Sequence, residues 1–247
     1  MSTPVEEMVG GQKAETMAAA KAAYEAGHDA ANRGAFAEAL DHSETAHRLF
    51  KAALGERDRS TLAAAGRIGQ MLTRLGRLPE ALEHNQAHLA VCREVLGEMD
   101  EESNIALDWV AQTLNQMGRY PEALARFDDV LHKRCDLFGE NHEGSIGSLI
   151  NVGGALYHLK RYPEALSRLQ LALKRGEESL GEDHCETLRA MSVMASTLSQ
   201  MNRHTEALEL EKKVLKRERK VCVCACGASR ITCGVNTRCL ASLTLIP

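Results

Sequence analysis

The feature that most constrains this chain is the phrase Glu-Ala-Leu, which recurs five times at a constant interval of 42 residues. The leucines of the five phrases are Leu40, Leu82, Leu124, Leu166 and Leu208. A fixed period of this length is typical of stacked supersecondary units, in which each unit buries its apolar face only against its neighbours. The sequence therefore predicts a repeat array, and an array of this kind works through an extended binding surface.

Other columns with the same 42-residue interval predict two helices in each unit. A glycine column, expected to end the second helix, consists of Gly55, Gly97, Gly139 and Gly181. A proline column is expected in the first turn of that helix, where a missing N–H costs nothing. Its members are Pro79, Pro121 and Pro163.

The first helix of each unit has its own markers. A Ser or Thr column is expected to begin this helix by accepting a hydrogen bond from a free backbone N–H. Its members are Thr61, Ser103, Ser145 and Thr187. Pairs such as Gly76-Arg77 are expected to end the helix, because glycine accepts the left-handed conformation.

The apolar residues between these markers have the helical period. One first helix carries an i, i+3, i+4, i+7, i+10 stripe, and its members are Leu107, Val110, Ala111, Leu114 and Met117. A column of small residues, Gly69, Ala111, Gly153 and Ala195, predicts that paired helices approach closely. The fold class predicted from these patterns is all-α.

This pattern, small/Leu/Ala followed by Pro-Glu-Ala-Leu, resembles the tetratricopeptide repeat. The 42-residue period, with Leu-Gly-Glu-Asp-His at residues 180–184, is similar to the long repeats of kinesin light chains. The resemblance covers residues 14–221, or about five units. It implies a right-handed α-solenoid of about five antiparallel helix pairs that serves as a non-catalytic protein-interaction scaffold.

Composition and charge exclude several other classes of function. The formal net charge is −4 with 26% charged residues, which does not favour a nucleic-acid or membrane-surface partner. No apolar run approaches the roughly 20 residues of a membrane helix, and residues 1–13 have no apolar signal segment and are expected to be a disordered tail. We therefore expect a cytoplasmic protein with a protein or peptide partner, and the oligomeric state stays open.

No motif of catalysis or cofactor binding is present, since the sequence has no Walker loop, no His-Glu-x-x-His and no nucleophile elbow. We expect no enzyme activity, no cofactor and no metal in the repeats. His84 and His88 have metal-ligand spacing, but the column of His88 is otherwise apolar, so it is interpreted as a packing residue. The segments 141–143 and 183–185 recur at the repeat period and are interpreted as turn and cap residues.

The resemblance implies that ligands bind to the concave face, which comes mainly from the first helix of each unit. Asn151 matches one asparagine of the Leu-Asn-Asn-Leu phrase of kinesin light chains, and Trp109 is either an aromatic anchor for a partner or a packing residue. The candidate peptide-binding residues are Arg67, Gln70, Arg74, Asp108, Trp109, Gln112, Asn115, Gln116, Asn151, Tyr157, His158, Arg189, Ser196 and Gln200.

The repeat pattern stops after Val221, and residues 222–247 form a cysteine-rich tail outside the repeats. Five cysteines of this tail, Cys222, Cys224, Cys226, Cys233 and Cys239, offer a thiolate metal site without a C-x-x-C pair. Alternatively, residues 220–224 can be encoded by an exon end followed by a GT run, so the tail would be translated intron. Two other functions stay open, a regulatory or sensor fragment of a larger nucleotide-switched protein and a thiol–metal-binding protein.

Overall fold

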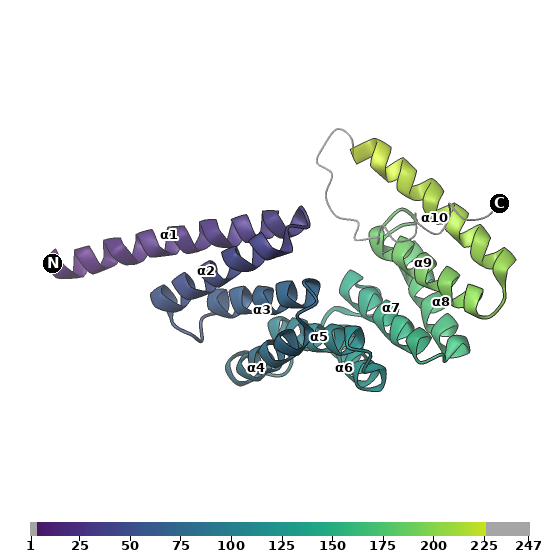
Figure 1. Cartoon of the computed structure of the whole chain (residues 1–247), viewed down its shortest axis with the longest axis horizontal. Coiled ribbons are helices and arrows are strands. Elements are labelled where there is room, and N and C mark those ends of the chain that lie inside the picture. Colours follow the sequence, from purple (N-terminus) through teal and green to yellow (C-terminus); the bar gives the residue numbers. More distant parts are fainter. Residues whose placement is uncertain (1–3, 226–247) are drawn as a thin grey trace. The chain divides into compact units, whose positions relative to one another are not determined.

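The computed structural model describes residues 4–225, and the side chains of residues 12–217. The described residues form ten helices and no strand (Figure 1). In chain order they are α1 (Pro4–Asn32), α2 (Phe36–Leu54), α3 (Arg59–Arg74), α4 (Leu78–Leu96), α5 (Glu101–Gln116), α6 (Tyr120–Phe138), α7 (Glu143–His158), α8 (Tyr162–Ser179), α9 (Cys185–Gln200) and α10 (His204–Ala225). The predicted all-α class with two helices in each repeat is confirmed.

The chain divides into two compact units, Met1–Glu140 and Asn141–Pro247. In the first unit each of the helices α1 to α6 packs on the next, and in the second unit α7 to α10 do the same (Figure 1). Helix α1 begins at Pro4, inside the segment 1–13 that we expected to be a disordered tail, and α10 continues past residue 221. The tail cysteines lie outside the described side chains, so the predicted thiolate site stays a prediction.

The first helices α3 and α5 end at the predicted glycines, Gly76 and Gly118. Gly76 has φ 75° and its N–H donates to the carbonyl of Thr73, while the N–H of Arg77 donates to that of Leu72 at 3.1 Å. Lys160 and Asn202 occupy the same column and adopt φ 60° without glycine. The left-handed turn is therefore a property of the repeat.

The start of each first helix differs from the prediction. The cap is the residue three positions earlier, and the caps are Asp58, Asp100, His142 and His184, whose side chains accept backbone N–H groups. The predicted Ser and Thr caps are wrong, because these residues lie inside the first turn. There the Thr61 hydroxyl donates to the carbonyl of Gly55 at 2.8 Å, and the Ser103 hydroxyl donates to that of Gly97 at 2.7 Å. These bonds close the turn between consecutive repeats. Because the turn recurs in each repeat, they explain why a Ser or Thr stands at this position every 42 residues. The interpretation of His142 and His184 as cap residues is confirmed.

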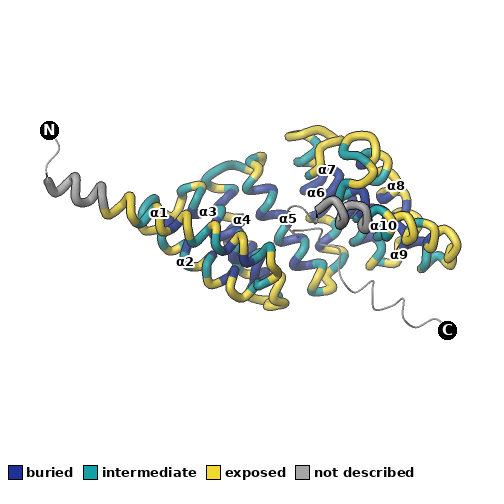
Figure 2. The backbone as a smooth tube through the Cα atoms, turned by 90° about the horizontal axis from the view of Figure 1, so that it is seen from above, coloured by how far each residue is buried: buried dark blue, intermediate teal, exposed yellow. Residues whose placement is uncertain are grey.

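The small-residue column lies where paired helices come closest. A Cβ atom built on Gly69 would lie 1.7 Å from Oδ1 of Asn85, and one on Gly153 would lie 2.7 Å from Cγ of Leu169. Buried residues run along the inner faces of the helices in each unit (Figure 2). The predicted close approach is confirmed at both glycines.

Part of the core of the first unit is polar. Thr73 of α3 and Thr113 of α5 are fully buried, and their hydroxyls lie 3.0 Å apart. The Asn85 amide of α4 donates to the Thr113 hydroxyl at 3.1 Å. Burying polar groups is tolerated only where they find partners, so this network fixes the register of three consecutive helices.

His88 is also buried, as its interpretation as a packing residue required. Its Nε2 lies 3.5 Å from the Cys92 sulfur on the next turn of α4. Burial lowers the pKa of His88 to about 4 and raises the pKa of the Cys92 thiol to about 12. Both groups are therefore neutral near pH 7, which suits a core position.

Candidate binding face

Three positions of each first helix, at i, i+3 and i+7, form a stripe on one helix face. We call the six members in the first unit the first-helix stripe. They are Arg67, Gln70 and Arg74 on α3, and Trp109, Gln112 and Gln116 on α5. All six stay half-buried or exposed, whereas the apolar residues between them are buried. Because α3 and α5 are in contact, the stripe places two guanidinium groups, three amides and one indole on neighbouring helices.

Arg67 is held in place by the first helix of the chain. Its guanidinium lies 4.0 Å from the ring centroid of Tyr24, and its Nη1 donates to the Tyr24 carbonyl at 3.3 Å. Together with Glu25, His28 and Asp29 these residues line an open hollow. A stacked arginine loses little side-chain freedom when it binds a ligand, so this position is preorganised. The sequence columns gave no reason to include Tyr24, because the first helix of the first repeat keeps only Gly27 of the small-residue column.

Trp109 and Asn115 differ in how much of their side chains a ligand could reach. The indole of Trp109 is half-buried, and its backbone carbonyl accepts a bond from the Thr113 hydroxyl at 2.7 Å. The side-chain oxygen of Asn115 is buried and has no hydrogen-bond partner among the described residues. Because this oxygen is not accessible, Trp109 is the residue of the two that offers surface to a ligand.

The predicted peptide-binding residues include Asp108, but the structure buries this side chain. It is 7% exposed, and its carboxylate pairs with Nη2 of Arg134 on α6 at 3.0 Å. The side chain therefore joins α5 to α6, and it does not point to a ligand surface. Arg134 carried a signal in the sequence, since three residues of the same column, Phe50, Cys92 and Gly176, are uncharged. A charge in a buried column indicates a buried partner.

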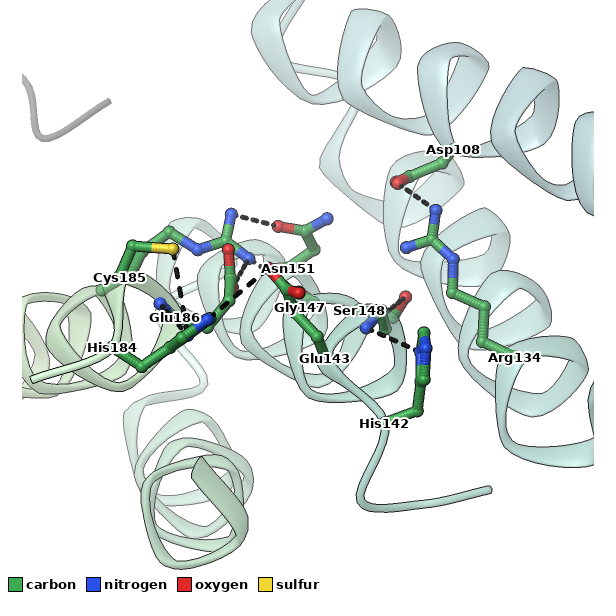
Figure 3. Close-up of polar contacts among 12 residues, drawn as sticks. Asp108, Arg134, His142, Glu143, Gly147, Ser148, Asn151, His184, Cys185 and Glu186 are labelled. Carbon is green, nitrogen blue, oxygen red and sulfur yellow. Dashed lines mark hydrogen bonds and ion pairs between the residues drawn. The ribbon is translucent and has the colours of Figure 1, made fainter. Parts of the chain in front are cut away.

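In the second unit the structure brings two predicted residues together. Nη1 of Arg189 on α9 donates to the side-chain oxygen of Asn151 on α7 at 3.2 Å (Figure 3). Nη2 of Arg189 donates to the Gly147 carbonyl at 3.0 Å and pairs with the Glu186 carboxylate at 2.6 Å. Glu186 was not predicted, although its three-residue spacing to Arg189 allows such a pair. The Arg189 guanidinium is thus held by Asn151, Gly147 and Glu186.

The remaining predicted residues lie near the ends of α7 and α9. The Tyr157 ring makes an edge contact with His158 at 5.3 Å and a tilted contact with Tyr162 at 5.8 Å between centroids. Partial burial lowers the pKa of His158, so the imidazole stays neutral near pH 7. Ser196 and Gln200 are exposed on α9, and the Ser196 hydroxyl donates to the Ser192 carbonyl.

Family models now identify the class of the protein. Two models of the tetratricopeptide repeat match the chain, one at residues 18–99 and 144–220 and the other at residues 107–143. These ranges cover most of the chain, so it belongs to the tetratricopeptide repeat family, and its fold is an all-α tetratricopeptide repeat solenoid.

Several solved structures share the fold of this chain. A Podosopora anserina structure described as kinesin light chain nearly identical TPR-like repeats is 18% identical, with a TM-score of 0.65 over 81% of this chain and 95% of that one. BtubC (BKLC) from P. vanneervenii is 15% identical, with a TM-score of 0.64 over 96% and 97%. The repeats therefore share the fold of structures with kinesin-light-chain-like repeats, which agrees with the predicted resemblance.

A Rap protein complexed with Competence and Sporulation Factor has the same fold, with a TM-score of 0.69 and 15% identity over 79% of this chain and 52% of that one. Among curated protein sequences, none matches this chain. In the described part of the chain, no helix combines the length and the apolar character needed to cross a membrane.

Proposed function

We propose that this array is a non-catalytic scaffold that binds an extended segment of a partner protein along its first helices, in the cytoplasm. The observation that carries the proposal is the first-helix stripe, where polar side chains and one indole remain accessible beside a buried apolar core. In a repeat array, residues that stacking does not require are free to differ between units. Arg67, Trp109 and Asn151 occupy one such column, and each has different chemistry.

The groups on this face suit the backbone of a peptide. Amides such as Gln112 both donate and accept, so they can pair with the N–H and C=O groups of an extended segment. The stacked guanidinium of Arg67 adds a donor for a carboxylate or carbonyl. Trp109 supplies the apolar area that often dominates binding energy.

The structural neighbours support a binding role of this kind. A Rap protein of the same fold was solved complexed with Competence and Sporulation Factor, and this chain spans about half of that protein (52%). A sensor or regulatory role within a longer protein is therefore the second candidate function, and it would use the same face.

A peptide-array screen followed by titration tests the proposal. The variant Trp109→Ala/Asn151→Ala removes one indole and one amide of the proposed face. The matched control is Arg119→Ala/Arg161→Ala, which removes two exposed side chains that pair with Glu122 and Glu164 outside this face.

Loss of a central anchor costs about 2 kcal/mol, so the Kd of recovered peptides should rise roughly 30-fold in the first variant. The control should bind with unchanged Kd, because exposed ion pairs contribute little. Equal Kd values for both variants and wild type would show that the first helices are not the working surface.

A further inference from the structure

Three side chains with metal-ligating chemistry meet in the second unit. Glu143 is the first residue of α7, His184 is the cap of α9, and Cys185 is its first residue. One ligand atom from each lies within 4.8 Å of the other two (Figure 3). Nε2 of His184 lies 3.9 Å from Oε1 of Glu143, and its Nδ1 lies 3.9 Å from the Cys185 sulfur.

Stacking explains why these residues meet. Glu143 and Cys185 are one repeat period apart, and the helices that they begin, α7 and α9, are in contact. Within each compact unit, the start of one first helix therefore lies beside the start of the next, α3 beside α5 and α7 beside α9. In the second compact unit, Glu143 thus faces the cap of α9.

The equivalent turn of the first compact unit holds an ion pair in place of these three donors. There the column residue is Arg59, and its guanidinium forms an ion pair with the cap carboxylate of Asp100. In the second unit Glu143 replaces the arginine, and a histidine replaces the aspartate. Three electron-pair donors then face one another at the place where the first compact unit has the Arg59 guanidinium.

The three donors suit one class of cation. Carboxylate oxygen, imidazole nitrogen and thiolate sulfur together select Zn²⁺ among the common divalent ions, with bonds of roughly 2.0–2.3 Å. Closing the present separations to that geometry requires only side-chain rotation, because Glu143 is exposed and the other two residues are half-buried. Water can complete a tetrahedral shell on the exposed side.

We propose that Glu143, His184 and Cys185 bind one Zn²⁺ ion, which joins the starts of two consecutive first helices. The site is separate from the proposed partner-binding function and does not depend on it. On binding, the Cys185 thiol gives its proton to solvent and the thiolate coordinates the metal. Binding of the ion gives up the cap bond in which Nδ1 of His184 accepts the Glu186 N–H at 3.3 Å, because a neutral imidazole has only one nitrogen lone pair to offer.

The test uses the full chain with the five tail cysteines replaced by serine, so that they do not compete for metal. Co²⁺ serves as the spectroscopic probe, and Zn²⁺ is titrated by calorimetry. We expect one bound ion per chain and a sulfur-to-cobalt charge-transfer band, which the tail cannot produce in this background.

Two variants remove ligands without removing the helix cap or the fold. His184→Asn keeps a capping side chain, because asparagine caps a helix as well as aspartate does and its neutral amide is not a usual zinc ligand, and Cys185→Ser removes only the sulfur. Both should weaken Zn²⁺ binding by at least about tenfold, since even outer partners of ligands contribute that much. Cys185→Ser should also abolish the charge-transfer band.

Matched controls change the same residue types elsewhere. His142→Asn replaces the other histidine cap, and Cys135→Ser removes a thiol of α6. Both should bind one ion with unchanged affinity. The proposal is overturned if the background binds no ion, or if His184→Asn and Cys185→Ser bind it as tightly as the two controls.

Discussion

Gly153 and Gly154 are neighbours in α7, and replacing each by alanine is predicted to change stability in opposite directions. A Cβ atom on Gly154 would meet nothing within 4 Å. Alanine there gains about 0.5–1 kcal/mol of helix stability, because glycine loses more backbone entropy on folding. The same gain applies at Gly153, since both positions lie in the interior of one helix.

At Gly153 a packing cost opposes that gain. The added Cβ would lie 2.7 Å from Cγ and 2.8 Å from Cδ2 of Leu169, whereas carbon atoms normally pack about 3.5–4.0 Å apart. Leu169 is fully buried and cannot swing into solvent. Overpacking of this kind costs about 1–3 kcal/mol. Because the helix gain is common to both variants, their difference in unfolding free energy equals this cost.

Urea unfolding followed by circular dichroism measures that difference. We expect Gly153→Ala to unfold about 1–3 kcal/mol more easily than Gly154→Ala, with equal m-values. In a Leu169→Ala background the clash is gone, so the two alanine variants should become equally stable. The reasoning is refuted if Gly153→Ala is as stable as Gly154→Ala in the presence of Leu169.

Three further predictions concern single side chains. Asp108→Asn should lower the free energy of unfolding by about 3–5 kcal/mol, because it breaks the largely buried ion pair with Arg134, and a double-mutant cycle with Arg134→Met checks the pairing. Asp58→Ala should cost about 1 kcal/mol by removing the cap of α3, whereas Asp58→Asn should be nearly neutral in the same unfolding assay. His88 has a pKa of about 4 in the folded state against 6.5 in the unfolded state, so the unfolded state binds more protons between these values. Stability should therefore fall as the pH falls from 6.5 to about 4, and His88→Val should reduce that fall in unfolding midpoints measured across this range.

The sequence predicts the helices well because every helix boundary is repeated. The columns of Gly76, Pro79 and Gly97 mark the same turns in most repeats, and a local backbone preference acts wherever the residue stands. The aspartate caps Asp58 and Asp100 were missed for a related reason. Their column also holds histidines and so has no constant residue type, while the Ser/Thr column of Thr61 suggested a cap and instead donates to a turn carbonyl.

The candidate sites are harder to predict because they depend on side chains from different helices. The pairing of Asp108 with Arg134 requires that α5 and α6 be placed together, which a column of residues does not express. The meeting of Glu143 with His184 likewise follows from the contact of α7 with α9. Periodicity shows which residues stacking does not need, but geometry decides whether they face a partner, a neighbour or one another.

The most direct test of the proposed function uses Trp109, the only tryptophan of the chain. Its emission reports on the first-helix stripe without any label, because the indole is half-buried there. A partner segment recovered from the screen is titrated into the protein, and calorimetry on the same sample establishes saturation. We predict a saturable blue shift of the emission, with a midpoint equal to the calorimetric Kd, as the segment covers the indole. An emission spectrum that stays unchanged at calorimetric saturation would contradict binding along the first helices.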